Sequence, residues 1–312
     1  MGHSKLDRPL YSLIVPTYRR PDVLSRCLQH IEQLDYPRES LEVLVYDNGS
    51  PDHVSDLIET FLARIPVVYT LNEPGHGMGY SLKKGVRDCR GERIVELNDD
   101  ALIPSDFLNR LNRVFDSAPS IGIVGVRAIE DGYFSHPNQS IGVIDSYGCE
   151  VVGNFDVPTN GPIPVEHVYG FCYAYTRELV RCGGVHDSIL LSQDFSSGNR
   201  LETDQCLSAV KLGFKVIYDG SIAVKHLAKP RVDISEKSPR WRMNHERNTL
   251  YLFLKHFGVF GNRFLAIRFG LRNLGIRSLL LNPSRINFTD FCASVNSRLA
   301  ALYYYTKYLI SR

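Results

Sequence analysis

Two groups of acidic and amide side chains are the residues of this chain best suited to chemistry. Asn98, Asp99 and Asp100 directly follow a short apolar run, and Glu202 and Asp204 lie much later in the chain. Oxygen ligands of this kind hold hard divalent cations, and a carboxylate can remove a proton as a general base. A pair of aspartates in a loop is also commonly a solvated turn or a helix cap, so the surrounding elements must decide between these interpretations.

The elements that position these residues alternate between strand and helix patterns. Strand-like apolar runs cover residues 11–17, 41–47, 66–71 and 93–97, with amphipathic helical patterns between them. Such alternation predicts right-handed crossovers and a parallel sheet, whose ligands bind beyond the carboxyl ends of the strands. Polar residues stand at three of these ends: Thr17, Asp47 and the cluster from Asn98 to Asp100.

The sequence argues against two common classes of nucleotide-binding enzyme. A glycine-rich loop covers residues 73–79, but the dinucleotide fingerprint lies directly between the first strand and the first helix. At that place the chain carries Pro16, Thr17, Tyr18 and Arg19, without glycine. No P-loop motif occurs in the sequence either. A Rossmann dehydrogenase and a P-loop enzyme are therefore disfavoured.

A series of short motifs runs through residues 8–256 in a fixed order. They are Ile14-Val15-Pro16-Thr17-Tyr18, Val45-Tyr46-Asp47-Asn48-Gly49-Ser50, Leu97-Asn98-Asp99-Asp100, Glu202-Thr203-Asp204-Gln205-Cys206-Leu207 and His226. In these motifs the chain resembles the family 2 glycosyltransferases, which have the GT-A fold. It departs from the family pattern at Asn98 and Glu202, where many members have aspartate.

The resemblance implies an α/β protein with the GT-A fold. This fold has a Rossmann-like nucleotide-binding sheet flanked by helices and a mixed sheet on the acceptor side. We expect a catalytic domain over residues 1–256, made of a nucleotide-sugar-binding half, 1–110, and an acceptor half, 111–256. A helical C-terminal appendage over residues 257–312 would follow it.

The resemblance also implies a divalent cation, Mn²⁺ or Mg²⁺, beside the donor diphosphate. Such a cation neutralises the charge that builds up on a departing diphosphate. Asp100 and His226 correspond to the family's metal ligands. Asp99 is expected to reach the ribose or a metal-bound water, and Asn98, which lacks a charge, to act through water.

The remaining nucleotide contacts implied by the resemblance come from the first two strands and the third helix. They are Pro16, Thr17, Tyr18, Arg19, Asp47 and Lys83. Asp47 would accept a hydrogen bond from the uracil or thymine of a UDP- or dTDP-sugar. Alternatively, Asp47 caps the turn that follows it, and Lys83 is a solvated helix residue.

Glu202 is the expected general base. In a direct displacement, a carboxylate on the acceptor side takes the proton of the attacking hydroxyl, and the anomeric configuration is inverted. Asp204 is the alternative base, although an acid in the first turn of a helix is also favoured by the helix dipole. Two residues apart on a helix, the two carboxylates should point to different faces.

We therefore expect an inverting, metal-dependent glycosyltransferase that moves a sugar from a nucleoside diphosphate to a hydroxyl of a glycan or glycolipid. At the level of the family, bacterial surface polysaccharide synthesis is the expected context. A retaining transferase on the same fold, a sugar nucleotidyltransferase and a non-catalytic carbohydrate-binding protein stay open as alternatives. A nucleotidyltransferase normally has a glycine-rich first loop, which is missing after Val15. The joint presence of Asp99, Asp100, Glu202 and His226 argues against a non-catalytic protein.

Composition restricts the partners and the compartment. The formal net charge of the 312 residues is only +2, which predicts no nucleic-acid partner. The seven cysteines show no metal-binding spacing and suit a reducing cytosol. Residues 1–10 contain no apolar core of a signal peptide. We therefore expect a cytoplasmic protein.

The C-terminal region differs from the rest of the chain. After Thr249, nine Lys and Arg residues stand against the single acid Asp290 and alternate with aromatic residues. This composition suits the surface of an anionic bilayer. The alternative is a helical subdomain packed on the core or on a second subunit. Residues 257–312 are thus expected to mediate peripheral membrane contact or homodimerisation.

Overall fold

A computed structural model describes the protein over most of its length. The described residues are 9–51, 54–72, 77–130, 140–145, 150–187, 190, 200–227, 239–258 and 285–311. All the expected site residues lie within these ranges. Most of the glycine-rich loop and residues 259–284 of the expected C-terminal appendage lie outside them.

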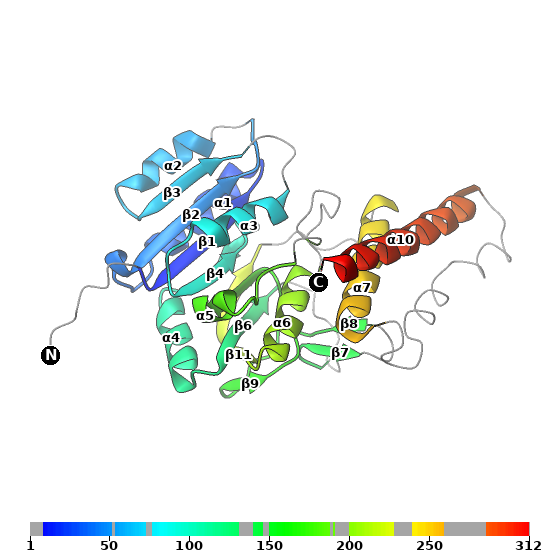
Figure 1. Ribbon diagram of the computed structural model, residues 1–312. Coiled ribbons are helices and arrows are strands. Elements are labelled where there is room, and N and C mark those ends of the chain that lie inside the picture. The colour runs from blue at the N-terminus through cyan, green and yellow to red at the C-terminus, as the bar shows by residue number, and fades with distance from the viewer. Residues whose placement is uncertain are drawn as a thin grey trace.

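The amino-terminal part consists of parallel strands separated by helices (Figure 1). Its elements are β1 (Tyr11–Thr17), α1 (Pro21–Glu32), the 3-10 turn η1 (Arg38–Ser40), β2 (Leu41–Asp47), α2 (Val54–Leu62), β3 (Val67–Leu71), α3 (Met78–Asp88) and β4 (Arg93–Leu97). β1 pairs in parallel with β2 and β4, and β2 pairs in parallel with β3. The parallel sheet expected from the sequence is confirmed, with strand ends within one residue of the apolar runs.

The second part extends the same sheet with strands of mixed direction. Its elements are β5 (Ala101–Leu102), α4 (Phe107–Ser117), β6 (Ile121–Ile129), β7 (Val143–Asp145), β8 (Glu150–Val152), β9 (Pro162–Pro164), β10 (Cys172–Thr176), α5 (Arg177–Arg181), α6 (Leu201–Lys211) and β11 (Lys215–His226). The main strand order is β3-β2-β1-β4-β10-β6-β11-β5, and β10 runs antiparallel to β4 and to β6. β9 pairs with β11, and β7 and β8 form a separate ribbon. The expected mixed sheet is therefore confirmed.

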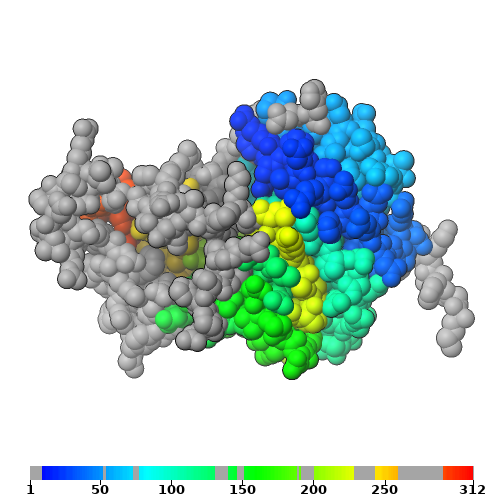
Figure 2. Space-filling view, turned by 180° about the vertical axis from the view of Figure 1, so that it is seen from behind, coloured from blue at the N-terminus to red at the C-terminus, as the bar shows by residue number. Residues whose placement is uncertain are grey.

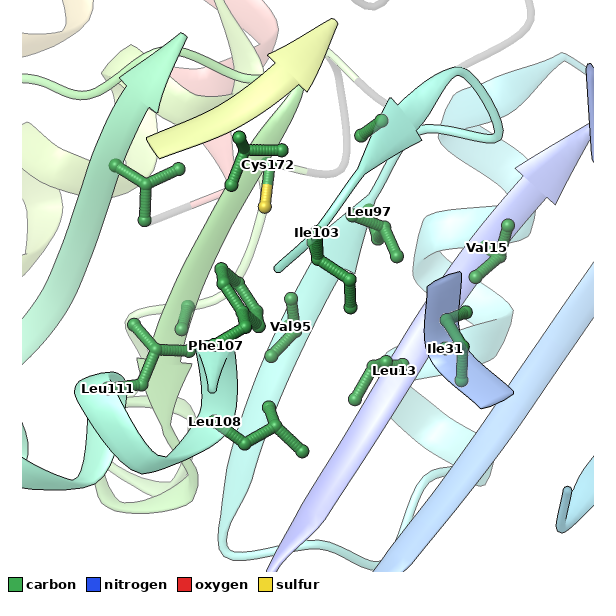
Figure 3. Packing of buried hydrophobic residues seen from close by; sticks show 14 of the residues in the cluster. Leu13, Val15, Ile31, Val95, Leu97, Ile103, Phe107, Leu108, Leu111 and Cys172 are labelled. Atoms are coloured by element: carbon green, nitrogen blue, oxygen red, sulfur yellow. The ribbon is translucent and has the colours of Figure 1, made fainter. Parts of the chain in front are cut away.

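Helices cover both faces of the sheet because the buried strands present apolar side chains to both sides. Leu13 and Val15 of β1 pack in one cluster with residues of α1, α2 and α4, part of which is drawn in Figure 3. Ile14, between them, belongs to a second cluster with residues of α3, α5, α6 and α7. Alternate side chains of a strand point to opposite faces, so both faces of β1 are buried.

α3 approaches β1 closely at a glycine. A Cβ atom on Gly85 would lie 2.5 Å from Cγ2 of Ile14, so only glycine allows this helix to sit so near the strand. Seen from behind, the yellow surface of the β11 region lies between residues of the β9 region and of α4 (Figure 2). Arg110 of α4 accordingly donates to the backbone oxygen of Ser221 in β11, at 2.9 Å.

The described residues of the carboxyl-terminal part include two long helices, α7 (Pro239–Phe257) and α10 (Arg285–Ile310). α10 crosses α7 at an angle (Figure 1), and Glu246 of α7 accepts from Ser294 and Arg298 of α10 at 2.8 and 2.9 Å. The expected C-terminal helix is therefore present and packs on α7. No helix within the described ranges is long and apolar enough to cross a membrane.

Candidate functional site

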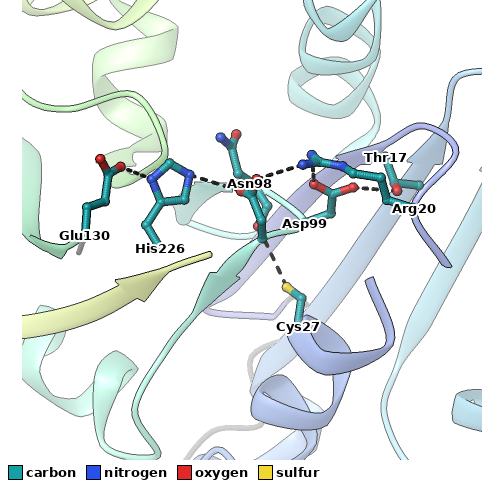
Figure 4. Close-up of polar contacts among 8 residues, drawn as sticks. Thr17, Arg20, Cys27, Asn98, Asp99, Glu130 and His226 are labelled. Atoms are coloured by element: carbon teal, nitrogen blue, oxygen red, sulfur yellow. Dashed lines mark hydrogen bonds and ion pairs between the residues drawn. The ribbon is translucent and has the colours of Figure 1, made fainter. Parts of the chain in front are cut away.

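A continuous chain of polar contacts lies at the carboxyl edge of the sheet (Figure 4). Thr17 donates to Asp99 at 2.7 Å, and the guanidinium of Arg20 pairs with Asp99 and lies 2.8 Å from Asp100. The other oxygen of Asp100 faces Nε2 of His226 at 3.1 Å. The structure thus brings together four residues expected from the sequence, Thr17, Asp99, Asp100 and His226.

The strand register explains why these residues meet. Ile14 lies opposite Glu96 in the parallel pair of β1 and β4, so the ends of both strands reach the same edge. His226 is the last residue of β11 and lies opposite Ala101 in β5. The short strand β5 therefore places Asp100 beside His226.

The second nitrogen of His226 contacts a residue that sequence reasoning missed. Nδ1 pairs with Glu130, which follows β6, and Tyr169 donates to Glu130 at 2.9 Å. The ring of Phe171 lies 4.7 Å from that of His226, between ring centroids. Glu130 and the aromatic rings fix the histidine so that Nε2 points at Asp100, as a carboxylate does for many metal-binding histidines.

The electrostatics of the edge differ between the two aspartates. Burial raises the pKa of Asp99 to about 6, although Arg20 and Thr17 act in the opposite direction. Burial also acts to raise the pKa of Asp100, but His226 and Arg20 outweigh it and hold this pKa below its usual value. Of the two aspartates, Asp100 therefore stays ionised to the lower pH.

The residues at this edge fit a divalent cation in part. Asp100 and His226 supply an oxygen and a nitrogen that face one another, and Asp99 adds negative charge. No group of three or more His, Cys, Asp or Glu side chains arranged to hold a metal ion occurs in the described ranges. Sites that bind a cation together with substrate phosphates commonly use only one or two carboxylates, so two protein ligands suit a cation that arrives with a diphosphate.

The neighbouring part of the edge is formed by the ends of β1 and β2. Thr17 lies opposite Asp47 in the register, and Asp47 accepts from Ser50 at 2.6 and 2.9 Å and from Tyr69 at 3.0 Å. The turn-capping role weighed for Asp47 is therefore present. Arg19 adopts a left-handed conformation with φ of 56° and donates its backbone N–H to Ser50 at 2.8 Å.

The other expected nucleotide contacts lie at different depths around this edge. Pro16 is buried in β1, opposite Tyr46. Tyr18 is 46% exposed, with the Arg19 guanidinium 5.0 Å from its ring centroid. The amide of Asn98 points away from the Asp99–Arg20 pair (Figure 4).

The structure does not bring Lys83 to the polar chain. Lys83 is exposed on α3, whereas its neighbour Lys84 lies 3.3 Å from Oδ1 of Asn72. Asn72 and Ser81 in turn contact Asn48, which follows Asp47, at 3.3 and 2.7 Å. Sequence position alone could not separate two adjacent lysines on one helix.

Glu202 lies beside a segment that contacts this edge. It belongs to the first turn of α6, and a Cβ atom on Gly170 would lie 2.9 Å from its Oε2. The next residue, Phe171, accepts a hydrogen bond from the backbone of Asn98 at 2.8 Å. Gly170 and Phe171 therefore lie between the acidic edge and Glu202. Burial raises the pKa of Glu202, which suits a group that must accept a proton.

Asp204 points the other way, as expected for carboxylates two residues apart. It is fully buried and contacts Lys255 of α7 at 2.7 Å and His256 at 2.7 Å. Burial acts to raise its pKa, but these two partners outweigh that effect and lower it. A carboxylate enclosed between two basic groups holds α7 against α6 and is a poor proton acceptor.

Sequence reasoning missed Arg20 and Glu130. Glu130 ends the apolar run of β6, so the rule that polar residues at strand ends mark a ligand site could have found it. Arg20 directly follows the expected contact Arg19, but nothing in the sequence indicates which of the two adjacent arginines points inward.

The sequence of the chain is similar to that of a known family. Residues 12–184, more than half of the chain, match the model of glycosyl transferase family 2. A dolichyl N-acetyl-alpha-D-glucosaminyl phosphate 3-beta-D-2,3-diacetamido-2,3-dideoxy-beta-D-glucuronosyltransferase of Methanococcus voltae is 24% identical over 230 residues, which are 71% of this chain and 68% of the relative. A poly(ribitol-phosphate) beta-glucosyltransferase of Bacillus spizizenii is 23% identical over 43% of this chain. The matches to this and several further curated relatives cover only 14–40% of their lengths.

Two solved structures resemble the whole fold. The Staphylococcus aureus protein TarS, residues 1–349 in complex with UDP-GlcNAc, has a TM-score of 0.63 at 14% identity, covering 93% of this chain and 81% of that one. The mannosyltransferase PcManGT of Pyrobaculum calidifontis, in complex with GDP-Man and Mn²⁺, has a TM-score of 0.57 at 19% identity, covering 95% and 86%. The expected GT-A fold is thereby confirmed. From the family match, the chain belongs to glycosyl transferase family 2.

Proposed function

We propose that this protein is an inverting glycosyltransferase that moves a sugar from a nucleoside diphosphate, UDP or dTDP, to a hydroxyl of a glycan or lipid-linked glycan. The observation that carries the proposal is that acidic side chains lie on both sides of one short segment. The pair Asp99 and Asp100 lies at the donor edge, and Glu202 lies across Gly170 and Phe171 from it. Membership of the family supports the same reaction class.

The donor side is suited to a diphosphate held with a divalent cation. Asp100 and His226 would hold Mn²⁺ or Mg²⁺, and the cation would neutralise the negative charge of the departing nucleoside diphosphate. Thr17 fixes the orientation of Asp99 by a 2.7 Å hydrogen bond. Asp47, beside Thr17, is proposed to accept from the base while its two oxygens stay oriented by Ser50 and Tyr69.

The acceptor side is suited to proton removal. Glu202 lies on α6 with its Oε1 3.2 Å from the hydroxyl of Thr203, and no ion pair of Glu202 occurs among the described residues. Its pKa is raised by burial, so the carboxylate binds a proton more tightly than an exposed one would. We therefore assign the general base to Glu202 and a structural role to Asp204.

The acceptor and the location are proposed on coarser grounds. A glycan or lipid-linked glycan of a bacterial surface polysaccharide agrees with the names of the relatives from Methanococcus voltae and Bacillus spizizenii. We place the protein in the cytoplasm, with residues 1–256 as the catalytic domain. Residues 257–312 are proposed to contact the anionic membrane surface on which a lipid-linked acceptor would lie.

The test is a transfer assay with a panel of UDP-, dTDP- and GDP-sugars and glycan acceptors. We expect release of the nucleoside diphosphate from a UDP- or dTDP-sugar, abolished by EDTA and restored by Mn²⁺. NMR of the product should show the inverted anomeric configuration. A product of retained configuration would refute the proposed mechanism, and turnover that persists in EDTA would refute the metal dependence. Failure of every donor in the panel would favour the non-catalytic alternative.

A further inference from the structure

Arg20 stands between the solvent and the two buried aspartates of the site. Its side chain is 46% exposed, whereas those of Asp99 and Asp100 are only 1% and 9% exposed. One guanidinium nitrogen pairs with Asp99, and the other lies 2.8 Å from Oδ2 of Asp100 (Figure 4). The guanidinium therefore neutralises the negative charge of both carboxylates from the side that faces the solvent.

The backbone of Arg20 is fixed while its side chain projects outward. Arg20 is the residue before α1, and its carbonyl accepts from Leu24 at 2.9 Å. The long side chain reaches the aspartates from the solvent side and is not enclosed by the core. Rotation about its side-chain bonds can thus move the guanidinium to a new partner without a change in the backbone.

A cation on Asp100 would compete with this guanidinium. Both are positive and would contact the same carboxylate, so the presence of one makes binding of the other less favourable. A donor diphosphate changes this balance because it brings negative charge to the same place. A planar guanidinium pairs well with phosphate oxygens through two parallel hydrogen bonds.

We propose that Arg20 exchanges partners during donor binding. In the free protein it neutralises Asp99 and Asp100, and when a divalent cation binds Asp100 it moves to the phosphate of the donor. Arg20 thereby makes the binding of the cation and of the nucleotide depend on one another. This inference rests on the proposed function, because it takes a nucleoside diphosphate as the ligand.

The test measures binding of Mn²⁺ and of UDP by isothermal titration calorimetry, each alone and each in the presence of the other. In the wild type, UDP should tighten Mn²⁺ binding by a factor within the usual range of roughly 5–150 for coupled sites. In Arg20→Ala, Mn²⁺ alone should bind about tenfold more tightly, because its competitor is gone. UDP at saturating Mn²⁺ should bind about tenfold more weakly, because a charged hydrogen bond is lost.

Two further variants separate the exchange from a general charge effect. Arg20→Lys keeps the positive charge but lacks the planar guanidinium. Mn²⁺ without UDP should therefore still bind as weakly as it does to the wild type, while the affinity for UDP falls. Arg26→Ala removes an exposed arginine of α1 and should change neither affinity. Circular dichroism and thermal unfolding of each variant verify the fold.

The possible results are distinguishable. Unchanged Mn²⁺ affinity in Arg20→Ala, or weaker binding of both ligands, would overturn the exchange and leave Arg20 as a fixed support of the aspartates. Absence of any UDP binding by the wild type with Mn²⁺ would instead refute the proposed function, and with it this inference. Tighter Mn²⁺ binding together with weaker UDP binding, seen in Arg20→Ala but not in Arg20→Lys or Arg26→Ala, would support the exchange.

Discussion

At the scale of single residues, Gly170 and Phe171 lie between the proposed donor edge and the proposed acceptor side. Phe171 holds the backbone of Asn98 and packs its ring on His226, and Gly170 leaves space for the carboxylate of Glu202. Two adjacent residues therefore contact both halves of the proposed reaction centre. Small changes here should alter turnover more than stability.

Glu202→Gln tests the assignment of the base. The amide keeps the shape of the side chain but cannot accept the proton, so turnover should fall by roughly 10²–10⁴ while UDP and Mn²⁺ affinities stay unchanged. Steady-state kinetics and calorimetry provide the two measurements. Glu59→Gln, at an exposed position of α2, is the matched control and should behave as the wild type. Near-normal turnover in Glu202→Gln would remove Glu202 from this role.

Gly170→Ala should displace the same carboxylate without removing it. The added Cβ would lie 2.9 Å from Oε2 of Glu202, which is the movable end of its side chain. Misplacement of a reacting group by about 1 Å can lower turnover by about 10²-fold, whereas nucleotide affinity should be unaffected. In a protein that already carries Glu202→Gln, the alanine should cause little further loss. An equal loss in both backgrounds would contradict this explanation.

At the scale of elements, buried polar clusters hold the helices and loops around the sheet. Lys255 of α7 joins Asp204 of α6 to Asp187, which accepts from it at 2.7 Å. Glu96 of β4 accepts from Tyr173 and Tyr175 of β10 at 2.9 and 2.8 Å. It also pairs with His186 of the loop after α5. Each cluster connects segments that are distant in sequence.

Asp204→Asn should destabilise the protein while leaving the chemistry in place. Removal of one partner of a buried ion pair typically costs about 3–5 kcal/mol. Here Lys255 and His256 lose a buried carboxylate, and only Asp187 still pairs with Lys255. Asp22→Asn, which changes an exposed first-turn acid of α1, should cost at most about 1 kcal/mol. Urea unfolding measures both. If Asp204→Asn folds normally and loses turnover, Asp204 is a base after all.

The His186 cluster predicts a dependence of stability on pH. Burial acts to lower the pKa of His186, but the charge of Glu96 outweighs it and the pKa is raised above the ordinary 6.5. The protonated imidazole thus stabilises the folded state fully below pH 6.5 and loses this effect as pH rises through the folded pKa. In urea unfolding, the deficit of His186→Gln relative to the wild type should be larger at pH 6 than at pH 9. An equal deficit at both values would contradict the prediction.

The sequence predicts those elements whose signal is local. The apolar runs of β1 to β4 and the polar residues at their ends are short-range patterns, so the parallel sheet and the Asp99–Asp100 edge could be predicted from them. The insertion of β10 between β4 and β6 depends on pairing across the chain, which no local pattern contains. The inward direction of Arg20 and the burial of Asp204 depend on tertiary packing in the same way.

At the scale of the whole molecule, the C-terminal helix α10 has one packed face and one exposed face. The inner face of α10 packs on α7, whereas Leu299, Tyr303 and Ile310 of its outer face are 60%, 56% and 80% exposed. The surrounding region carries nine cations and one acid after Thr249. A second copy would bring the same charge, so we propose an anionic bilayer as the partner of this face.

Replacement of Leu299, Tyr303 and Ile310 by serine should weaken binding to anionic vesicles about tenfold or more, because apolar area and anionic attraction together drive such binding. Co-sedimentation with vesicles of phosphatidylglycerol and phosphatidylcholine measures the effect. Leu62→Ser with Leu71→Ser removes apolar side chains that are 54% and 61% exposed on α2 and β3, and should leave binding unchanged. Equal binding of the wild type and the α10 variant would refute a role for this face.

The position of β10 in the sheet also determines the order in which the molecule can be completed. Its neighbour β4 leaves the ribosome well before β10 does. The elements synthesised between them include α4, β6, β7, β8 and β9. At roughly 5–20 residues per second, β4 waits for several seconds with one apolar edge unpaired. During that time the nascent chain exposes a strand edge of the kind that other chains can join. Slower synthesis lengthens this exposure, so expression at low temperature should help only if chaperones occupy the edge until β10 arrives.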